Sequence, residues 1–453
     1  MDAFDLIVIG SGPGGYVAAI RAAELGMKVA CIEKDKVLGG TCLHVGCIPS
    51  KALLQATEHY QWLTTKAAEF GIIGSAVVDF PALMQRKEGI VKGLASGIAT
   101  HFTKEKIETV YGNAQFTSPT AVAVGDRQLT AKWFIVATGS VPIALPFLPF
   151  DEKKVVSSTG ALALESVPEK MVVVGGGAIG VELASVYARL GSSVQIVEML
   201  PQIVAGFDGA VSRLLLQLLQ KQGIVFHLEA TVQSAKVQEQ SVLLSVQQKE
   251  QTKEIEADVV LVAVGRRPYT QGLDLEKAGV KTTPKGFINV DGNLRSSNPQ
   301  VMAIGDVIEG PMLAHRASHE GIALAEHLAG KTAQMQAISI PNVVYTHPEA
   351  ASVGLTEEEA KAAGLSTFTG QAWFKGNGRA RCEGETEGFV KLLGEKSSGR
   401  LIGLHIIGAH ASELIAEGVI ALDKRATVRD LAHGCFPHPT LSEVVMEAAR
   451  AAL

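Results

Sequence analysis

The sequence contains little cysteine and no long apolar run. Its five cysteines are scattered over 453 residues, too few for the disulfide scaffold that stabilises small secreted domains. Three of them, Cys31, Cys382 and Cys435, have no partner suggested by their spacing, and we expect buried thiols. The most apolar window, residues 134–150, is interrupted by Gly139 and three prolines and is short for a bilayer helix. These absences disfavour a disulfide-stabilised secreted protein and a membrane protein.

The chain also lacks a strong excess of either charge. Its formal net charge is −5, and no basic stripe interleaved with aromatic residues is present, so we expect no nucleic acid partner. A strand-like run, Leu6–Ile9, begins almost at once and leaves no room for a signal or transit peptide. We therefore expect a cytoplasmic protein, and its length of 453 residues predicts two to four domains.

Cys42 and Cys47 lie in the glycine-rich segment 39–51, with four residues between them. On an ideal helix, Cα atoms five positions apart are about 8 to 9 Å from each other, beyond the reach of an unstrained disulfide. Gly46 and the glycine pair before Cys42 would let the backbone deform enough to close the ring, and a small strained ring is easily reduced. In a reducing compartment, such a pair indicates a catalytic disulfide. Lys51 follows Cys47 by four residues and would share its face of a helix.

Residues 6–33 and 171–198 repeat one pattern of strand, glycine-rich turn, helix and strand. Each landmark recurs at an offset of 165 residues. The landmark pairs are Gly10/Gly175, Gly26/Gly191 and Glu33/Glu198. A single G-x-G-x-x-G motif is weak evidence, but two copies, each with an acid 23 residues after its first glycine, are specific. The repeat predicts two βαβ units that bind dinucleotides.

Each part of the repeat has a physical reason. The first glycine makes a tight turn, the second lets the backbone approach the pyrophosphate, and the third allows helix and strand to pack closely. The helix N-terminus receives the phosphates, and the acid at the end of the second strand binds a pair of ribose hydroxyls. Glu198 is followed by Met199, Leu200 and Pro201, none of which offers the arginine that a 2′-phosphate needs. The second unit therefore favours NAD over NADP.

The rest of the chain predicts further strands. Apolar runs that end at Gly139 and Gly265, and the run Val301–Asp306, predict buried strands that deliver loops to the ligand edge of a sheet. Alternation over residues 231–257 predicts an antiparallel meander. From about residue 338, strand-like and helix-like runs alternate without a nucleotide motif. The predicted fold class is α/β, with two Rossmann-like dinucleotide-binding domains and a C-terminal α+β domain.

The C-terminal region contains the run His438-Pro439-Thr440-Leu441-Ser442-Glu443. Pro439 predicts a helix that starts there and continues to Ala452. A histidine just before a helix can be oriented by a carboxylate a turn or more along it, which suits a proton carrier. The alternative is a structural cap with a solvated glutamate, and the pattern by itself favours that alternative.

Several motifs occur in the order that one family shows. They are Gly-Gly-Thr-Cys-Leu-x-x-Gly-Cys-Ile-Pro-Ser-Lys, the two dinucleotide motifs, Ala-Thr-Gly-Ser, Val-Gly-Arg-Arg-Pro, Ile-Gly-Asp with Met-Leu-Ala-His, Tyr-Thr-His-Pro-Glu and His-Pro-Thr-Leu-Ser-Glu. Across essentially the whole chain, the sequence resembles the dihydrolipoamide dehydrogenase family of flavin disulfide reductases. The resemblance implies an FAD-binding domain in two parts (1–145 and 268–337), an NAD-binding domain (146–267) and a dimerisation domain (338–453).

The resemblance also implies the cofactor sites, with FAD in the first unit and NAD in the second, and it implies no metal. The implied FAD-binding residues are Gly10, Gly12, Gly15, Glu33, Lys51, Ala114, Thr138, Gly139, Ser140, Asp306 and Ala314. The implied NAD-binding residues are Gly175, Gly177, Gly180, Glu182, Glu198, Val232 and Gly265. Lys51 and Glu182 would meet near the reactive edge of the flavin.

By the same resemblance, Cys42, Cys47, His438 and Glu443 are catalytic. Dihydrolipoamide would exchange with Cys42, Cys47 would face the flavin, and electrons would pass through FAD to NAD. His438, oriented by Glu443, would carry protons from the other subunit of a homodimer. The implied partners are the lipoyl domains of 2-oxo acid dehydrogenase complexes or the carrier protein of glycine cleavage.

Two residues depart from the family pattern. His44 stands where the family usually has Asn, and Phe436 stands where relatives often have His, so we expect tuning rather than loss of activity. A zinc site at Cys42, His44 and Cys47 has poor spacing and lacks a fourth ligand.

The alternative functions are a reductase for another disulfide or a metal ion, and a docking subunit with dispensable redox chemistry. Three features argue against these alternatives: the residues after Glu198, the lack of paired C-terminal cysteines, and the intact catalytic residues.

Overall fold

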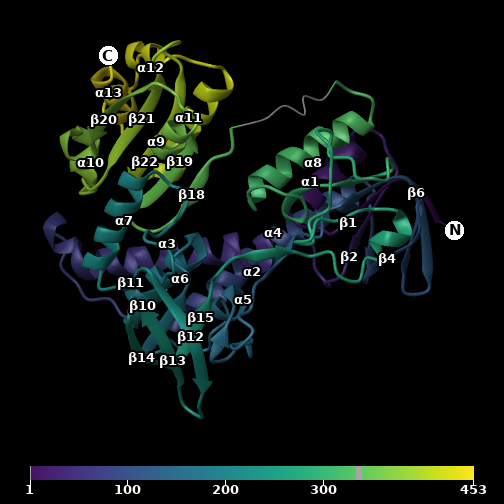
Figure 1. Cartoon of the computed structure of the whole chain (residues 1–453), viewed down its shortest axis with the longest axis horizontal. Coiled ribbons are helices and arrows are strands. Elements are labelled where there is room, and N and C mark those ends of the chain that lie inside the picture. Colours follow the sequence, from purple (N-terminus) through teal and green to yellow (C-terminus); the bar gives the residue numbers. More distant parts are fainter. Residues whose placement is uncertain (1, 333–338) are drawn as a thin grey trace. The chain divides into compact units, whose positions relative to one another are not determined.

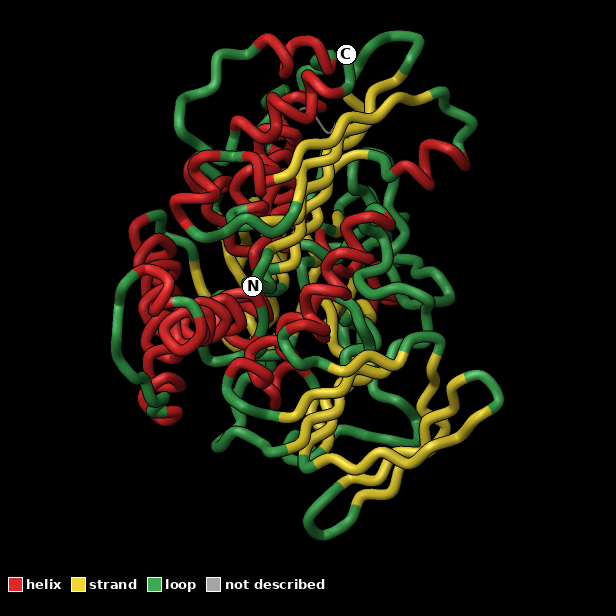
Figure 2. Tube along the Cα trace, turned by 90° about the vertical axis from the view of Figure 1, so that its left-hand side faces the viewer, coloured by secondary structure: helices red, strands yellow, loops and turns green. Residues whose placement is uncertain are grey.

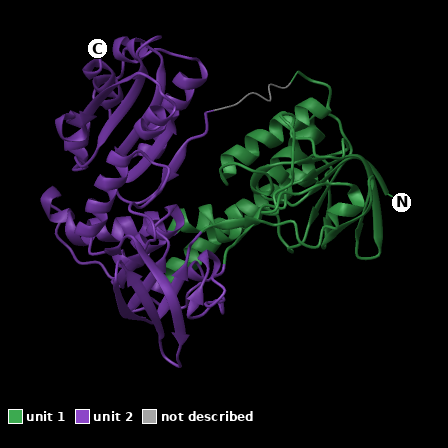
Figure 3. Ribbon diagram, viewed as in Figure 1, with its two compact units in different colours: residues 1–52, 81–143, 265–336 green, residues 53–80, 144–264, 337–453 purple. Residues whose placement is uncertain are grey.

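The computed structural model describes residues 2–332 and 339–453. The chain forms two compact units, coloured separately in Figure 3. The first unit comprises residues 1–52, 81–143 and 265–336, and the second comprises residues 53–80, 144–264 and 337–453. The predicted boundary between residues 337 and 338 lies outside the described residues. The division into four segments stays a prediction.

A seven-stranded sheet forms the centre of the first unit, in the order β3-β2-β1-β6-β5-β4 with β17 also paired to β6 (Figure 1). Its strands are β1 Asp2–Ile9, β2 Val29–Glu33, β3 Glu108–Tyr111, β4 Ala114–Ser118, β5 Ala121–Val124, β6 Arg127–Val136 and β17 Val301–Ala303. Strands β1, β2, β3, β6 and β17 run parallel, and β4 and β5 are antiparallel. A separate antiparallel pair consists of β7 Ser140–Pro142 and β16 Arg266–Pro268.

Strand β1 is buried on both faces, which explains its continuous apolar run. Ile7 and Ile9 belong to one core with residues of β4 and β5, whereas Leu6 and Val8 belong to another core with residues of three helices. Side chains alternate between the faces of a strand, so consecutive apolar residues are required when both faces are covered. The structure therefore confirms the predicted buried parallel strands of this unit.

Helices α1 Pro13–Glu24 and α8 Ala314–Leu328 pack against each other in the first unit. A Cβ on Gly321 would lie 2.6 Å from the carbonyl oxygen of Gly14, so only a glycine allows this approach. Helix α1 connects β1 to β2 and completes the first βαβ unit. Two short 3₁₀ turns, η2 Leu275–Ala278 and η3 Gly305–Val307, complete this part.

The second unit contains the second βαβ repeat, in a parallel sheet of order β11-β10-β9-β15-β8. Its elements are β8 Val155–Val156, α5 Ser158–Ala161, β9 Lys170–Val174, α6 Ala178–Arg189, β10 Ser193–Val197, α7 Gly209–Lys221, β11 Val225–His227 and β15 Val259–Val262. The expected meander is present as an antiparallel sheet of β12 Ala230–Val237, β13 Val242–Gln248 and β14 Gln251–Ala257. Both expectations are confirmed.

The C-terminal part of this unit is a five-stranded antiparallel sheet of order β18-β19-β22-β21-β20, with helices packed on it (Figure 2). Its strands are β18 Asn342–Val344, β19 Glu349–Gly354, β20 Thr367–Trp373, β21 Phe389–Glu395 and β22 Leu401–Gly408. Its helices are α9 Glu357–Ala362, η4 Phe374–Gly376, α10 Gly378–Glu383, α11 Ala411–Asp423, α12 Val428–His433 and α13 Glu443–Ala451. This arrangement confirms the predicted α+β region.

The remaining helices are α2 Gly40–Val45, α3 Cys47–Thr65, η1 Ala67–Phe70 and α4 Phe80–Lys104. Helix α4 is long, but much of its surface is polar. Within residues 2–332 and 339–453, no helix is long and apolar enough to cross a membrane.

Two local expectations are wrong. The last helix begins at Glu443 and not at Pro439, because the Thr440 amide donates to the Glu443 carboxylate and residues 438–442 form a turn. Cys31 is buried as expected, but Cys382 and Cys435 are exposed.

Candidate active site

The first glycine loop contains two glycines that the fold itself requires. Gly10 has φ +99°, and a Cβ there would lie 2.5 Å from the carbonyl oxygen of Ala137. A Cβ on Gly15 would lie 1.9 Å from the carbonyl oxygen of Gly10. In contrast, a Cβ on Gly12 would meet no protein atom within 4 Å, although Gly12 caps the N-terminus of α1. The space beside Gly12 fits a phosphate that approaches the backbone and the helix N-terminus.

The second loop repeats this arrangement. Gly175 has φ +110°, and a Cβ there would lie 2.4 Å from the carbonyl oxygen of Ala263. A Cβ on Gly180 would lie 2.0 Å from the carbonyl oxygen of Gly175, and one on Gly177 would meet nothing within 4 Å. Both loops therefore contain the same opening at a helix N-terminus, and both fit a dinucleotide pyrophosphate.

A buried carboxylate stands beside each loop. Glu33 accepts hydrogen bonds from the backbone N–H and the hydroxyl of Ser11, at 2.9 and 2.6 Å. Glu198 accepts from the backbone N–H groups of Gly176 and Leu200, at 2.6 and 2.7 Å. Both side chains are held where an acid can bind ribose hydroxyls. Ser11 was not among the predicted residues, although its place inside the first motif signals it.

Asp306 lies in η3, directly after strand β17, and contacts a predicted neighbour. The hydroxyl of Ser140 donates to Asp306 at 2.5 Å, and Arg266 donates to the same hydroxyl and to the Ser140 carbonyl, both at 2.7 Å. Burial lowers the pKa of Arg266. The hydroxyl of Thr138 donates to the carbonyl of Tyr269 at 2.5 Å. Arg266 is a site residue that the sequence reasoning missed, although it belongs to the Val-Gly-Arg-Arg-Pro motif.

The remaining predicted cofactor residues occupy varied positions. Ala114 is the first residue of β4 and is buried in a core of the first unit, and Ala314 is the first residue of α8. Val232 is buried in β12, two residues after Ala230, whose N–H donates to the Glu198 carbonyl at 2.9 Å. Gly139 and Gly265 have φ +72° and +122°. The cofactor contacts of these residues stay predictions.

The cysteine pair forms a disulfide across a break between two helices. Helix α2 ends at Val45, Gly46 has φ −146° and ψ −115°, and helix α3 begins at Cys47. The break brings the Cα atoms of Cys42 and Cys47 to 4.7 Å. A Cβ on Gly46 would lie 2.9 Å from the carbonyl oxygen of Thr41, so glycine is required. The expectation that the backbone deforms at Gly46 is confirmed.

Two ionisable side chains accompany the disulfide. Cys47 is the first residue of α3, where the helix N-terminus favours a thiolate. Lys51 lies four residues along the same helix, on the same face. The Nε2 atom of His44 is 2.8 Å from the carbonyl oxygen of Leu38, which makes Nε2 the donor.

Among the described residues, no group of three or more His, Cys, Asp or Glu side chains could hold a metal ion.

The C-terminal histidine and glutamate are paired. Nδ1 of His438 is 2.9 Å from Glu443, whose other oxygen accepts from the Thr440 N–H at 2.9 Å. These contacts lower the pKa of Glu443, with the Thr440 amide as the larger cause and His438 next. The His438 side chain is 79% exposed, so Nε2 is accessible. The pair is an oriented imidazole, in agreement with the proton-carrier interpretation.

Glu182 is buried in α6 and accepts a hydrogen bond from the backbone N–H of Tyr345 at 3.0 Å. The disulfide and Lys51 belong to the first unit, whereas Glu182, His438 and Glu443 belong to the second. The pairing of Lys51 with Glu182 therefore stays a prediction.

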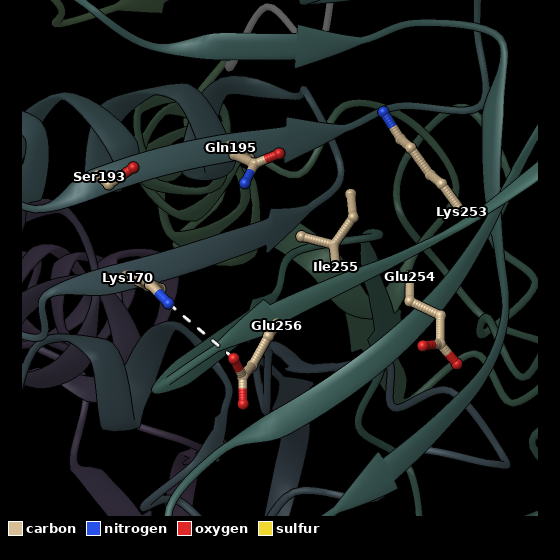
Figure 4. A pocket seen from close by; sticks show the side chains of 7 residues that line it. All are labelled: Lys170, Ser193, Gln195, Lys253, Glu254, Ile255 and Glu256. Atoms are coloured by element: carbon tan, nitrogen blue, oxygen red, sulfur yellow. Dashed lines mark ion pairs between the residues drawn. The ribbon is translucent and has the colours of Figure 1, made fainter.

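An open hollow of about 340 Å³ lies on the second unit, apart from these motifs. Figure 4 shows Lys170 and Glu256 pointing toward each other across it, with their charged atoms 3.9 Å apart. Its lining residues are Lys170, Ser193, Gln195, Lys253, Glu254, Ile255 and Glu256. None of the predicted site residues lines it, so it does not belong to the candidate active site.

Comparisons with known proteins cover nearly the whole chain. Residues 4–321 match the model of the pyridine nucleotide-disulphide oxidoreductases, and residues 340–449 match the dimerisation domain of the same family. Dihydrolipoyl dehydrogenase 1 of Arabidopsis thaliana mitochondria is 47% identical, with 99% of this chain and 90% of the relative aligned. Dihydrolipoyl dehydrogenase 3 of Pseudomonas aeruginosa is 45% identical, with 99% and 98% aligned.

Solved structures agree with this assignment. LpdA of Mycobacterium tuberculosis superposes with a TM-score of 0.91 and 26% identity over 98% of this chain and 99% of that chain. The flavoprotein disulfide reductase RclA of Escherichia coli, as a Cu(II) complex, superposes with a TM-score of 0.89 and 26% identity over 99% of both chains. The two glycine loops fit FAD and NAD, and the disulfide follows the first loop. The chain therefore belongs to the dihydrolipoyl dehydrogenases, pyridine nucleotide-disulphide oxidoreductases that use FAD and NAD.

Proposed function

We propose that the Cys42–Cys47 disulfide oxidises dihydrolipoamide carried on lipoyl domains, with His438 as the acid-base group and NAD as the final acceptor. The observation that carries this proposal is the disulfide closed across the helix break at Gly46, in a chain that also presents an oriented histidine. We assign residues 1–145 and 268–337 to FAD binding, 146–267 to NAD binding and 338–453 to dimerisation.

The predicted residues would hold the cofactors as follows. Glu33 and Asp306, with the first glycine loop, would hold FAD, and Glu198, with the second loop, would hold NAD. When bound, FAD supplies the two-electron chemistry that links a dithiol to NAD. The Glu198 carboxylate repels a 2′-phosphate in a poorly solvated cleft, which supports NAD over NADP.

The dithiol half of the reaction uses only the chain's own residues and the substrate. A substrate thiol loses its proton to Nε2 of His438, and the thiolate attacks Sγ of Cys42. The Cys42–Cys47 bond breaks, Cys47 leaves as a thiolate, and a mixed disulfide forms. The second substrate thiol then passes its proton to Sγ of Cys42 as its sulfur displaces Cys42, which closes the lipoamide disulfide. Cys42 is left as a thiol, Cys47 as a thiolate, and the first proton stays on His438.

Glu443 holds His438 through Nδ1, so Nε2 is the atom that accepts and returns the proton. The helix N-terminus at Cys47 favours its thiolate, which makes it a good leaving group. His438 is exposed in the single chain, which supports its delivery to the disulfide of a partner subunit in a homodimer. A cytoplasmic location is part of the same proposal, and Lys51 and Glu182 would adjoin the flavin.

The proposal is tested with the holoenzyme and free dihydrolipoamide. Cys42→Ser should abolish dihydrolipoamide oxidation and keep FAD bound, since the glycine loops are unchanged. His438→Gln should reduce the same activity by about two to four orders of magnitude, the range for a positioned acid-base group. Oxidation of NADH by an artificial one-electron acceptor serves as the control and should persist in both variants.

Near-normal dihydrolipoamide turnover in Cys42→Ser would exclude the disulfide mechanism. Faster reduction of another disulfide or of a metal ion by the unaltered enzyme would instead favour the alternative reductase.

A further inference from the structure

The segment Tyr345–Glu349 is the Tyr-Thr-His-Pro-Glu motif, which has no role in the proposed function. His347 lies in this segment, between β18 and β19, and both of its ring nitrogens face carboxylates. Nδ1 is 3.1 Å from Glu58 of α3, and Nε2 is 2.9 Å from Glu385. Ionised carboxylates only accept hydrogen bonds, so both ring nitrogens must carry protons. The geometry therefore requires an imidazolium between two carboxylates.

Other charges around His347 maintain this arrangement. Lys66, directly after α3, donates to Glu385 at 2.9 Å, and Arg189 of α6 donates to the Leu54 carbonyl at 3.1 Å and attracts Glu58. Burial alone would raise the pKa values of Glu58 and Glu385, but the hydrogen bonds from His347 leave both below their usual values. Glu349 of the same segment also adjoins Glu58, and burial raises its pKa. Both carboxylates that contact the ring are therefore ionised.

The backbone of the same segment is fixed at neighbouring positions. Gln222 donates through its amide to the His347 carbonyl at 2.6 Å, and the Thr346 hydroxyl donates to the Pro348 carbonyl at 2.8 Å. Two residues before His347, the backbone N–H of Tyr345 donates to the buried Glu182 carboxylate at 3.0 Å. The ring of His347 and the side chain of Glu182 are thus connected through three residues of one segment.

We propose that His347 is a positioning residue for the nicotinamide half of the reaction, because its doubly bridged imidazolium holds the Tyr345 amide against Glu182. The inference rests on the proposed NAD role of Glu182. In this role His347 acts only through Glu182 and contacts neither a substrate nor a cofactor.

The bridge depends on pH. Burial alone would lower the pKa of His347, but the hydrogen bonds that its ring donates to Glu385 and Glu58 raise it from 6.5 to about 9. Because the pKa of His347 is raised, the imidazolium bridge to Glu58 and Glu385 is intact below pH 6.5 and is lost as the pH rises through about 9. The KM for NAD should therefore rise on the alkaline side in the unaltered enzyme.

The test compares two variants of the holoenzyme. His347→Gln cannot donate to both carboxylates, and we expect a KM for NAD at pH 7.5 about three- to tenfold higher, without the alkaline rise. His347→Lys keeps the cation and should restore the KM and move the alkaline rise to higher pH. Anaerobic reduction of the enzyme by dihydrolipoamide should stay within about twofold in both variants.

His405→Gln is the matched control for the loss of a buried histidine. His405 lies in β22 of the same unit and contacts Ser352 at 2.6 Å and the Leu355 carbonyl at 3.0 Å. This variant should lower thermal stability without changing the KM for NAD. An equal change of KM in His347→Gln and His405→Gln, or an unchanged pH profile in His347→Lys, would overturn the inference. The lysine variant decides the question if the glutamine variant does not fold.

Glu182→Gln separates this inference from the proposed function. If Glu182→Gln leaves the NAD kinetics unchanged, the assigned role of Glu182 is wrong and the function proposal must be revised. If Glu182→Gln raises the KM, the double variant with His347→Gln should raise it no further, because both changes act on one contact. Additive effects would show that His347 acts elsewhere.

Discussion

Some glycines of the two glycine loops are required by the fold, and others are not. Gly175 is required by the fold, because its φ is +110° and a Cβ would overlap Ala263. The fold does not require a glycine at position 177. A Cβ on Gly177 would meet nothing within 4 Å, and its φ of −74° is open to other residues. A glycine that the protein does not need is explained by a ligand that approaches the backbone closely.

Gly177→Ala should therefore fold normally and bind NAD poorly. We expect an unchanged Tm and a KM for NAD at least about tenfold higher, which corresponds to about 1.4 kcal/mol. Gly175→Ala should instead lower the Tm, because it combines a positive φ with overlap of backbone atoms. Thermal unfolding and NAD kinetics measure the two effects.

Gly12→Ala is the control for this pair, since it occupies the matching position in the first loop. It should reduce flavin retention and leave the KM for NAD unchanged in the fraction that keeps its flavin. A normal KM in Gly177→Ala would contradict the phosphate assignment of the opening.

At the scale of elements, Asp208 joins a helix to a strand far away in the sequence. It caps α7 by accepting from the Ala210 N–H at 2.9 Å, and its other oxygen accepts from Lys391 of β21 at 2.8 Å. Asp208 is 0% exposed, while Glu357, the other partner of Lys391, has a side chain that is 54% exposed. Burial would raise the pKa of Asp208, but Lys391 leads the contacts that lower it below 3.8. The ion pair therefore stabilises the fold at neutral pH.

Asp208→Asn should keep the helix cap but leave Lys391 without its buried partner. The free energy of unfolding at pH 7 should fall by about 3 kcal/mol, as measured by urea unfolding. A lowered pKa gives stability above the ordinary value of 3.8 that is lost as pH falls, so the difference from the unaltered protein should shrink below that pH.

Glu357→Gln removes the exposed partner of the same lysine and is the matched control. It should cost less than about 1 kcal/mol, since solvent screens exposed ion pairs. Equal losses in both variants would show that burial does not decide the strength of this contact.

At the scale of the whole molecule, the proposed proton carrier and the disulfide belong to different units. The C-terminal region matches a dimerisation domain, and His438 is exposed in the single chain. A homodimer in which each disulfide receives His438 from the partner accounts for both observations.

Complementation tests this arrangement. A Cys47→Ser chain and a His438→Gln chain should each be nearly inactive with dihydrolipoamide as homodimers. Co-expression should restore substantial activity, because a heterodimer with shared sites contains one intact site out of two. If tagged pull-down confirms the heterodimer and the mixture is as inactive as both parents, His438 and the disulfide act within one chain.

Features that depend on short spacings along the chain can be predicted from the sequence. The two dinucleotide units follow from glycines and an acid at fixed intervals, because a turn, a helix and a strand have fixed lengths. The disulfide was predicted in the same way, since the glycines around Cys42 and Cys47 allow the helix to break. Buried parallel strands were evident from apolar runs, because both of their faces exclude water.

The folded structure is needed to know which distant side chains meet. It pairs Asp208 with Lys391 and places His347 between Glu58 and Glu385, contacts that no local pattern reveals. It also shows that the last helix begins at Glu443, whereas the sequence predicts that it begins at Pro439. The reason is that ion pairs and caps depend on burial and on partners supplied by folding, whereas spacing along the chain specifies only local backbone geometry.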